Sequence, residues 1–476
     1  MLGIDLGTSA VKVAVVGTDE EVLGEGIAEF ETDTTLPQQA EQAPEDWLKA
    51  TETAMQMLAD QMARQDRDWA RRVAAIGLTG QLPTLVCLSD GGPIAPAVTW
   101  KDGRADAWAA TRITRGEHYA RTGMPIDGRY LAPMFQFHFS GRADQVRTIL
   151  SAKDYLLYAL TGLRITEPST AAGYGVYDLQ TRAFAPDLCR FWNVPERVLP
   201  RLLPANSLAG PLSEAGATLL GLAAGIPVST GAADSVSSSY SMAGLDEQVV
   251  SISFGSSAVI LAASASMRLD PSARYLLTPH AEEGWYGREM DILASGTGYH
   301  WLSSLFGWAE GQIDRRAADS VPGAHGLSFP PYLAGGEQGA LWNPRLRGAI
   351  MGLSLNHTRA DIARAYLEGV FFEVKRCVDV LTETLPIEAV RVGGRIVHEP
   401  SSMQMLADIL GHTVTEVTDQ SPAAIGAALL ARRLMQSGGS EEGGSRLLRT
   451  ARPDARTSQI YRSLYQEYLA RAARCE

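Results

Sequence analysis

Residues 4–14 read IDLGTSAVKVA, and residues 252–262 read ISFGSSAVILA. Aligned without a gap, with Gly7 opposite Gly255, the two stretches are identical at six of eleven positions. In each, two apolar runs flank a small glycine-containing turn, which is the pattern of a β-hairpin. No short-period repeat accompanies the pair, so we interpret it as the duplication of a domain. Chance similarity between two hairpins rich in glycine and serine is the alternative.

An α/β pattern continues around both hairpins. Apolar positions alternate with polar ones across residues 22–30, which predicts a further strand. Pro44, followed by two acids, begins a stretch with a helical apolar stripe, as suits a helix N-terminus. Tyr461, Tyr465 and Tyr468 share a similar stripe near the C-terminus and predict an amphipathic helix. Short apolar runs and helical patterns alternate elsewhere, which indicates an α/β fold, at residues 73–78, 226–230, 249–254, 358–381 and 390–392.

Length and composition limit the classes of function. A chain of 476 residues is long enough for two or three domains, each with its own core. The net charge of −12 and the scattered arginines argue against nucleic acid or an anionic membrane as the main partner. The four cysteines and eight histidines are dispersed, which argues against a disulfide framework or a zinc site. We recognise neither a signal peptide nor an apolar run of membrane-spanning length, and we therefore expect a cytoplasmic protein that binds a small molecule.

The turns of the two hairpins have the chemistry of a phosphate site. A Gly-Thr/Ser-Ser tip exposes backbone N–H groups and hydroxyls with little bulk around them, so it can cradle phosphate oxygens. Two such tips facing each other would hold a polyphosphate from both sides. Asp5 distinguishes the first copy from the second, where Ser253 stands, and a carboxylate beside a phosphate turn can hold Mg²⁺ directly or through water. A turn-capping aspartate is the alternative.

The motifs, in their order and spacing, resemble those of the FGGY carbohydrate kinases over nearly the whole chain. The matching stretches are GIDLGTSAVKVAVV at 3–16, GLTGQLPTLVCLSDGG at 77–92, PAVTWKDGRA at 96–105, SAKDYLLYALTG at 151–162, GAADS at 231–235, SFGSSAVI at 253–260 and RGAIMGLSLNHTRADIARAYLEGVFFE at 347–373. The resemblance implies two duplicated actin-like (RNase H-like) ATPase domains with a catalytic cleft between them. We expect the first lobe over residues 1–242 and the second over residues 243–476.

Asp234 is the residue that we expect to be catalytic. It follows an apolar strand and the unhindered residues 231–233, so its carboxylate should project into the cleft. Phosphoryl transfer to an alcohol needs a group that accepts the hydroxyl proton, and the resemblance assigns this general-base role to Asp234. A helix N-cap is the alternative. On the substrate side the resemblance implies Gln81, Leu82, Trp100, Asp102, Arg104, Tyr130 and Asp234 itself, although Trp100 could equally be a core residue.

The resemblance also implies a nucleotide site. Thr8, Ser9 and Lys12 of the first hairpin, and Gly255 and Ser256 of the second, are expected near the phosphates of ATP. Gly296, in ASGTG, is expected near the middle of ATP, and Gly393 and Gly394 beside adenosine, where the backbone must come close to the ligand. An ordinary strand-to-helix turn is the alternative for the last pair. The cofactors expected are therefore ATP and Mg²⁺, the latter held by Asp5.

The layout is closest to the xylulokinase-like branch, which implies ATP-dependent phosphorylation of a small ketose such as xylulose or ribulose. Leu82 and Pro83 follow Gln81 where xylulose kinases usually carry Met-His, and residues 393–399 also depart from the family pattern. A lost polar contact to a sugar hydroxyl changes specificity, so a kinase for another polyol or sugar (glycerol, erythritol or sedoheptulose) is an alternative. A catalytically silent ATP-binding regulator is another. A homodimer is expected from family habit alone.

Overall fold

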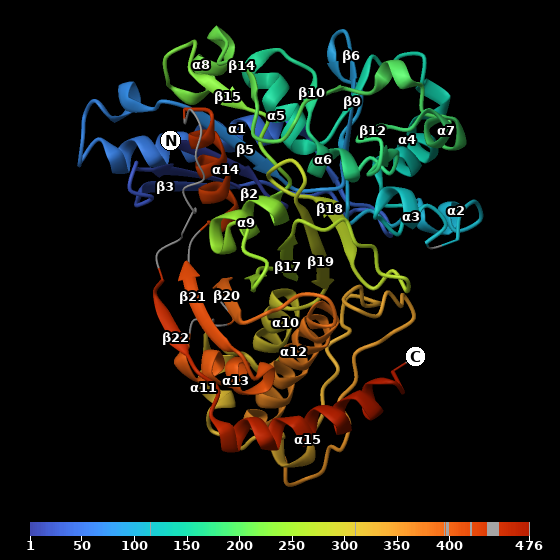
Figure 1. Ribbon diagram of the computed structural model, residues 1–476, viewed down its shortest axis with the longest axis vertical. Coiled ribbons are helices and arrows are strands. Elements are labelled where there is room, and N and C mark those ends of the chain that lie inside the picture. Colours follow the sequence, from blue (N-terminus) through green and yellow to red (C-terminus); the bar gives the residue numbers. More distant parts are fainter. Residues whose placement is uncertain are drawn as a thin grey trace.

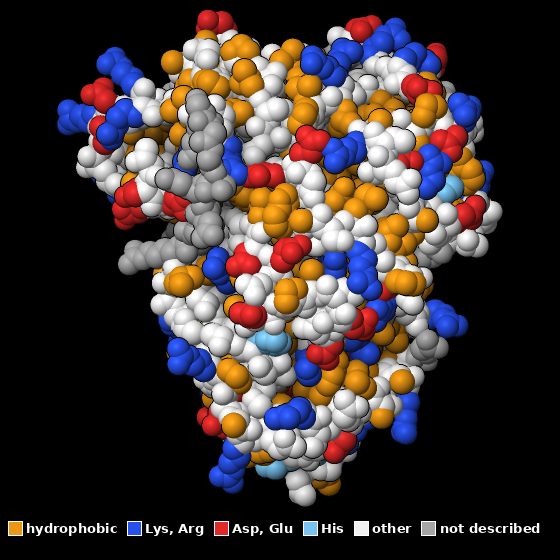
Figure 2. Space-filling model, in the orientation of Figure 1, with side chains coloured by type: hydrophobic (Ala, Val, Ile, Leu, Met, Phe, Trp, Pro, Cys, Tyr) orange, Lys and Arg blue, Asp and Glu red, His pale blue; other side chains and the backbone are white. Residues whose placement is uncertain are grey.

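The computed structural model describes residues 1–114, 116–309, 311–394, 396, 399–418, 421–435 and 447–475. The chain forms two large β-sheets with helices packed around them, one in each half of the elongated molecule (Figure 1). This arrangement confirms the predicted α/β class. On the face shown in Figure 2, acidic and basic side chains are interspersed. In the described ranges no helix has the length and apolar character needed to cross a membrane.

The first sheet contains the N-terminal hairpin. Its six strands lie in the order β14 (Leu208–Pro211), β15 (Pro227–Ser229), β5 (Ile76–Gly80), β1 (Leu2–Leu6), β2 (Ala10–Val16) and β3 (Val22–Glu29). β1, β2 and β3 are antiparallel neighbours, whereas β5 runs parallel to both β1 and β15. The predicted hairpin and the strand after it are confirmed, and β1 is fully buried because helices cover both faces of this sheet.

The second sheet repeats the first and extends it. Its order is β18 (Leu276–Pro279), β19 (Tyr286–Ile292), β17 (Ala258–Ser264), β16 (Val249–Phe254), β20 (Ala389–Gly394), β21 (Thr413–Thr418) and β22 (Arg449–Ala451). The central series β19-β17-β16-β20-β21 has the same order and strand directions as β3-β2-β1-β5-β15. The duplication is therefore confirmed. The hairpins differ in one respect, because Leu6 pairs with Val11 in the first copy and Phe254 pairs with Ala258 in the second, which leaves a shorter turn.

Helices α9 (Asp234–Ala243) and α14 (Pro422–Arg433) lie between the two sheets and pack on each other (Figure 1). α14 comes from the second half of the sequence but packs against β1 and β5 of the first sheet. Glycines make this approach possible, since a Cβ on Gly3 would lie 1.8 Å from the Ala424 carbonyl oxygen and one on Gly77 1.7 Å from that of Ala427. The two halves are thus joined by closely packed helices beside the site described below.

Other predicted helices are also present. α1 (Pro44–Met62) buries Trp47 and Leu58 against β2 and β3. α15 (Ala455–Ala472) packs Tyr461 and Tyr468 on Phe372 of α12 (Arg359–Thr382). The remaining α-helices in the described ranges are α2 (Asp106–Ala109), α3 (Tyr119–Thr122), α4 (Leu131–Phe139), α5 (Ala152–Thr161), α6 (Pro168–Ala172), α7 (Pro186–Phe191), α8 (Glu214–Leu220), α10 (Gly296–Phe306), α11 (Gln312–Ala317) and α13 (Pro400–Leu410).

A smaller set of strands completes the first half and carries several predicted site residues. β4 (Glu41–Gln42), β8 (Ala97–Thr99), β6 (Thr84–Ser89) and β7 (Gly92–Pro93) form one path, and β9 (Thr148–Leu150) pairs with β6. Two short pairs, β10 (Ile165–Thr166) with β13 (Arg201–Leu202) and β11 (Tyr177–Asp178) with β12 (Ala183–Phe184), lie nearby. All four cysteines are buried free thiols, as expected.

Candidate active site

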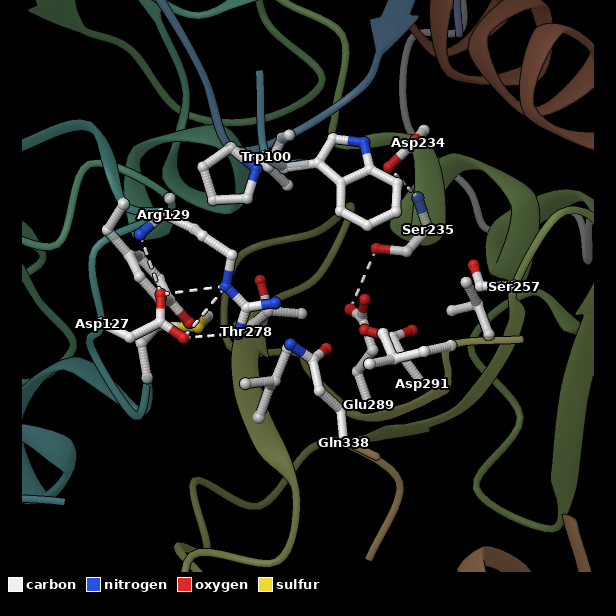
Figure 3. Close-up of a pocket in the computed structure, with 18 of the residues that line it drawn as sticks. Trp100, Asp127, Arg129, Asp234, Ser235, Ser257, Thr278, Glu289, Asp291 and Gln338 are labelled. Carbon is white, nitrogen blue, oxygen red and sulfur yellow. Dashed lines mark hydrogen bonds and ion pairs between the residues drawn. The ribbon is translucent and has the colours of Figure 1, made fainter. Parts of the chain in front are cut away.

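A cavity lies between the two halves of the molecule, and both contribute to its wall (Figure 3). Of the residues predicted from the sequence, five line it: Thr8, Leu82, Trp100, Tyr130 and Asp234. The remaining lining residues are Pro83, Met124, Asp127, Arg129, Ser169, Gly173, Ser235, Ser257, Val259, Leu276, Thr278, Glu289, Asp291, Leu293, Gln338 and Trp342. The wall therefore combines two indoles and aliphatic groups with several carboxyls, a mixture suited to the apolar faces and hydroxyls of a carbohydrate.

Asp234 is the first residue of α9, directly after the turn that follows β15. Gly231 in this turn has φ of 73°, and a Cβ there would lie 1.9 Å from the Leu78 carbonyl oxygen, so the turn requires glycine. Asp234 Oδ1 accepts a hydrogen bond from Ser235 N at 2.8 Å. Burial, and then the charges of Asp5 and Asp291, raise the pKa of Asp234 to about 7. Its carboxylate is thus suited to exchange a proton near neutral pH.

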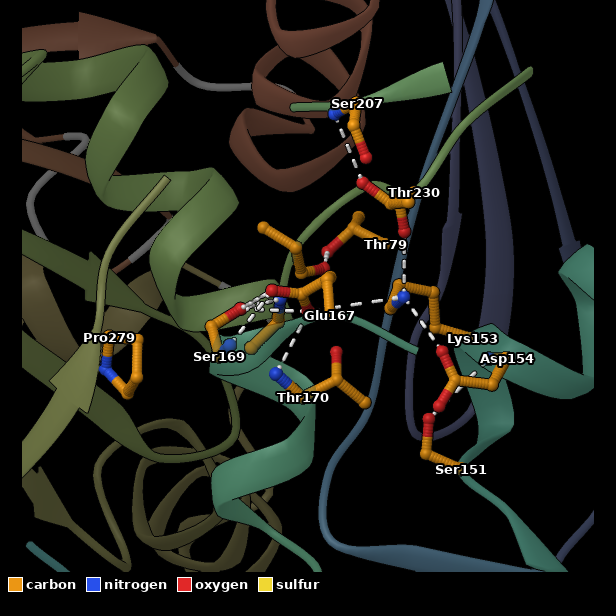
Figure 4. Close-up of polar contacts among 12 residues, drawn as sticks. Thr79, Ser151, Lys153, Asp154, Glu167, Ser169, Thr170, Ser207, Thr230 and Pro279 are labelled. Atoms are coloured by element: carbon orange, nitrogen blue, oxygen red, sulfur yellow. Dashed lines mark hydrogen bonds and ion pairs between the residues drawn. The ribbon is translucent and has the colours of Figure 1, made fainter. Parts of the chain in front are cut away.

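Buried polar contacts fix the backbone of the segment at residues 230–233, directly before Asp234 (Figure 4). Lys153 Nζ donates to the Thr230 carbonyl oxygen at 2.7 Å and to Asp154 Oδ1 at 2.8 Å. Ser169 Oγ donates to the Glu167 carboxylate at 2.9 Å and accepts from Ala233 N at 2.9 Å.

Thr79 Oγ1 completes this clamp by donating to the Ala232 carbonyl oxygen at 2.8 Å. Sequence reasoning noted the Lys-Asp motif at 153–154 without assigning it a role. Its signal was a lysine and an aspartate at the start of an otherwise apolar helix, where buried charges require partners. We infer that these contacts position Asp234 relative to the cavity.

Asp5 lies on β1 with only 6% of its surface exposed. Among the described residues its buried Oδ1 has no hydrogen-bond partner. Burial raises the pKa of Asp5 to about 6, although Lys12 on the neighbouring strand acts in the opposite direction. An orphaned carboxylate oxygen is a ligand that a divalent cation prefers. The described residues contain no cluster of three or more acids, histidines or cysteines that could hold a metal alone, so a cation at Asp5 would share its coordination with phosphate oxygens and water.

Three predicted substrate residues do not line the cavity. Gln81 is fully buried, and its Nε2 donates to Gln42 Oε1 at 2.7 Å. Asp102 accepts from Ala40 N at 3.0 Å and from Arg104 Nε at 3.0 Å, and Arg104 also reaches Glu41 at 2.5 Å. Each of the three makes contacts with the segment around β4, and their contact with a substrate stays a prediction.

Trp100 and Tyr130 do reach the cavity. Trp100 Nε1 donates to Thr8 Oγ1 at 3.2 Å, so the indole contacts the turn of the first hairpin. Trp100 is only partly buried, in contrast to a core tryptophan such as Trp47. Tyr130 is 8% exposed at the N-terminus of α4. Both aromatic rings therefore offer apolar surface within the cavity.

The predicted nucleotide residues of the second half lie together at the ends of β16 and β20. Gly296 N donates to the Gly255 carbonyl oxygen at 3.1 Å, and a Cβ on Gly296 would come within 2.2 Å of that oxygen. Gly393 and Gly394 pair with Ser253 and Phe254. Residues 395, 397 and 398 lie outside the described ranges, and with them part of the unusual 393–399 segment.

In the first half, Ser9 is exposed at the tip of the turn and Lys12 is partly buried on β2, opposite Asp5. Neither lines the cavity. Their contact with a nucleotide stays a prediction.

Sequence reasoning missed several polar groups in the cavity. Arg129 and Asp127 form an ion pair, with Arg129 Nε 3.1 Å from Asp127 Oδ2. With its amide oriented to satisfy both groups, the Gln338 oxygen accepts from Arg129 Nη2 at 2.6 Å. Glu289 and Asp291 enter from β19. Their signal was the placement of two acids at alternate positions of a strand, on either side of the apolar Met290, which puts both on one face.

Comparisons with known proteins agree with this geometry. Residues 1–240 match the FGGY family of carbohydrate kinases, N-terminal domain, and residues 250–435 match the C-terminal domain. The chain is 30% identical over 446 residues to the xylulose kinase of Escherichia coli (strain K12), covering 90% of this chain and 89% of the relative. It is 24% identical over 454 residues to the gluconokinase of Bacillus subtilis (strain 168), covering 90% and 86%. The crystal structure of xylulose kinase from Rhodospirillum rubrum superposes with a TM-score of 0.88, at 26% identity and 99% and 98% coverage.

Proposed function

The chain is a member of the FGGY family of carbohydrate kinases, and from that premise we propose that it transfers the γ-phosphoryl group of ATP to a hydroxyl of a small ketose, with Asp234 as general base. A pentulose such as xylulose or ribulose is the acceptor that the similarity to xylulose kinases favours. The observation that carries the proposal is the position of Asp234 in a cavity walled by both halves of the duplicated fold, with a pKa raised to about 7 by burial.

In this reaction the acceptor hydroxyl attacks the γ-phosphorus while the bond to the β-phosphate oxygen breaks. Asp234 accepts the hydroxyl proton as the attack proceeds. The contacts of Lys153 with Thr230 and of Ser169 with Ala233 hold the turn that carries Asp234, so its carboxylate needs no reorganisation during the step.

Asp5 would hold Mg²⁺, directly or through water, with its orphaned Oδ1. When bound, Mg²⁺ neutralises the negative charge on the phosphates. Backbone N–H groups at Gly255 and Ser256, together with the Thr8 hydroxyl, are the groups of this chain that we assign to the phosphates.

We propose that residues 1–242 form the lobe that binds mainly the sugar and residues 243–476 the lobe that binds mainly the nucleotide. Closure of the lobes would then exclude water from the reacting groups. The α9–α14 pair, which joins the two sheets, is the natural hinge region.

A direct measurement of ADP release tests the function against its alternatives. Purified protein with MgATP is assayed with pentuloses, tetruloses, heptuloses, glycerol and other alditols. We expect at least one pentulose to stimulate ADP release, with a product that carries one phosphate. Greater stimulation by glycerol, erythritol or sedoheptulose would reassign the acceptor, and a regulator would show no stimulation by any of them.

A further inference from the structure

One wall of the cavity is unusually acidic. Glu289 and Asp291 stand two residues apart on β19 and share a face of the strand, while Met290 between them is buried in the core of the second half. Their partners across the sheet include Leu276 on β18 and Val259 on β17, which also line the cavity. This acidic wall, defined as Glu289 and Asp291, therefore faces Trp100 and Asp234 across the cavity (Figure 3).

The acidic wall has little positive charge to neutralise it. The charged groups among the described lining residues are four carboxyls and one guanidinium, that of Arg129. Arg129 is already engaged by Asp127 and by the Gln338 amide. Among the described residues, Glu289 Oε2 accepts from the Ser235 hydroxyl at 2.9 Å, and the buried Asp291 Oδ1 has no hydrogen-bond partner. The acidic wall thus has acceptor capacity that the described residues leave unused.

The protonation behaviour of the acidic wall agrees with this environment. Burial, and then the charge of Asp291, raise the pKa of Glu289 well above its ordinary value. Burial raises the pKa of Asp291 to about 6, against the opposing effect of Arg129. A raised pKa favours the neutral form of each carboxyl, so hydrogen-bond donors from a ligand would stabilise the ionised forms, whereas a further anion would be repelled by whichever of Glu289, Asp291 and Asp234 are ionised.

We propose that Glu289 and Asp291 determine acceptor specificity: they bind hydroxyl groups of an uncharged polyhydroxylated acceptor other than the one that reacts, and they exclude acceptors that carry a carboxylate. This inference rests on the proposed function and deepens it, because it states which sugar-like acceptors the enzyme uses, the uncharged ones, and which it rejects, those with a carboxylate. Carboxylates form charge-assisted hydrogen bonds with hydroxyls, and a buried acceptor site discriminates strongly against a ligand that cannot donate to it. Like charges placed together in such a site cost several kcal/mol in general, which corresponds to a discrimination on the order of 10²-fold or more.

The test compares acceptors that share a carbon chain and differ in charge. A five-carbon ketose, the corresponding alditol, an aldonate and an amino-deoxy alditol are each assayed for kcat/KM with MgATP and, in parallel, for binding by calorimetry without ATP. The enzymes compared are the wild type, Glu289→Gln, Asp291→Asn and the double variant. Glu388→Gln is the matched control, since Glu388 is an exposed carboxylate immediately before β20 that accepts a hydrogen bond from Gln248.

We expect the wild type to favour the ketose or alditol over the aldonate by about 10²-fold or more in both readouts. In the double variant, kcat/KM for the uncharged acceptors should be about 10-fold lower than in the wild type. The ratio of kcat/KM for an uncharged acceptor to kcat/KM for the aldonate should fall by at least about 10-fold. The Glu388 control should change neither ratio. If the acidic wall had a merely structural role, its substitution would lower kcat/KM for all acceptors by the same factor. Thermal unfolding of each variant shows whether the fold is kept.

Equal use of aldonate and ketose by the wild type would overturn the inference and leave the kinase function standing. A preference above about 10-fold for the amino-deoxy alditol would also overturn it, since the wall would then be a cation site. If no acceptor stimulates ADP release, the proposed function fails. The ratios of the affinities measured by calorimetry then still decide whether the acidic wall excludes ligands that carry a carboxylate.

Discussion

The acidity of Asp234 can be tested directly through the pH dependence of turnover. A base that acts only as a carboxylate loses activity as it is protonated, so the raised pKa predicts an acidic limb near neutrality. With a pKa of about 7, roughly one tenth of the enzyme is ionised at pH 6 and roughly nine tenths at pH 8. We therefore expect kcat/KM for MgATP to rise about 10-fold between these pH values.

The causes of the shift supply two diagnostic variants. Asp5 is the largest charged contributor that raises the pKa of Asp234. Replacing it with asparagine removes that charge, so the acidic limb of Asp5→Asn should move to lower pH. In Asp234→Asn the limb should vanish, and the residual rate should be nearly independent of pH over the same range.

The assay should detect ADP directly, because coupling enzymes have pH profiles of their own. Magnesium is kept in excess so that ATP remains complexed at every pH, and kcat/KM for MgATP reports the enzyme before MgATP binds. A limb centred below pH 5 would refute the reasoning, as would a limb that persists in Asp234→Asn. A limb near pH 7 that is unchanged in Asp5→Asn would show that burial and the charge of Asp291 cause the shift without Asp5.

Three further outcomes are expected. Asp234→Asn should lower kcat about 10²–10⁴-fold with ATP binding kept, measured by steady-state kinetics and ATP calorimetry, and near-normal turnover would remove the assignment. Ser169→Ala removes the hydroxyl that accepts a hydrogen bond from Ala233 N, and a buried unsatisfied donor costs about 1–3 kcal/mol. We therefore expect kcat to fall several-fold, with KM for MgATP unchanged. A change in KM alone would contradict a positioning role. Gly77→Ala would place a Cβ 1.7 Å from the Ala427 carbonyl oxygen and should lower the free energy of unfolding by about 1–3 kcal/mol or more. The control Gly141→Ala, whose Cβ would have nothing within 4 Å, should not lower it. Equal melting temperatures for the two variants would refute the close packing of α14.

The sequence predicted most reliably what depends on local pattern. Alternating apolar residues on both sides of Gly7 and Gly255 are sufficient to define the two hairpins, and their similarity predicts the repeated strand order. Asp234 could be placed at the cavity because a strand followed by small residues leaves its direction little freedom. These features need no knowledge of distant contacts.

What the sequence could not supply depends on distant partners. Asp102 and Arg104 have the chemistry of sugar ligands, but the contacts they make come from Ala40 and Glu41, sixty residues earlier, in a segment with no distinctive pattern. The acidic residues of β19 posed the opposite problem. Alternation places both on one face of the strand, but only the packing of the two halves decides that this face borders a cavity.

Duplication explains how one architecture can serve a transfer between two unlike ligands. Equal strand orders place two small turns at corresponding positions, which suits a triphosphate held from both sides, while the differences between copies supply the asymmetry that catalysis requires. Asp5 has its counterpart in Ser253, so only one turn carries a carboxylate suited to a cation. β19 in turn corresponds to β3, yet β3 packs on α1 whereas β19 contributes two carboxyls to the cavity. If the acidic wall selects the acceptor as proposed, the copy that we assign to the nucleotide also contributes to the choice of sugar, and specificity can change there without altering Asp234 or the turn that carries it.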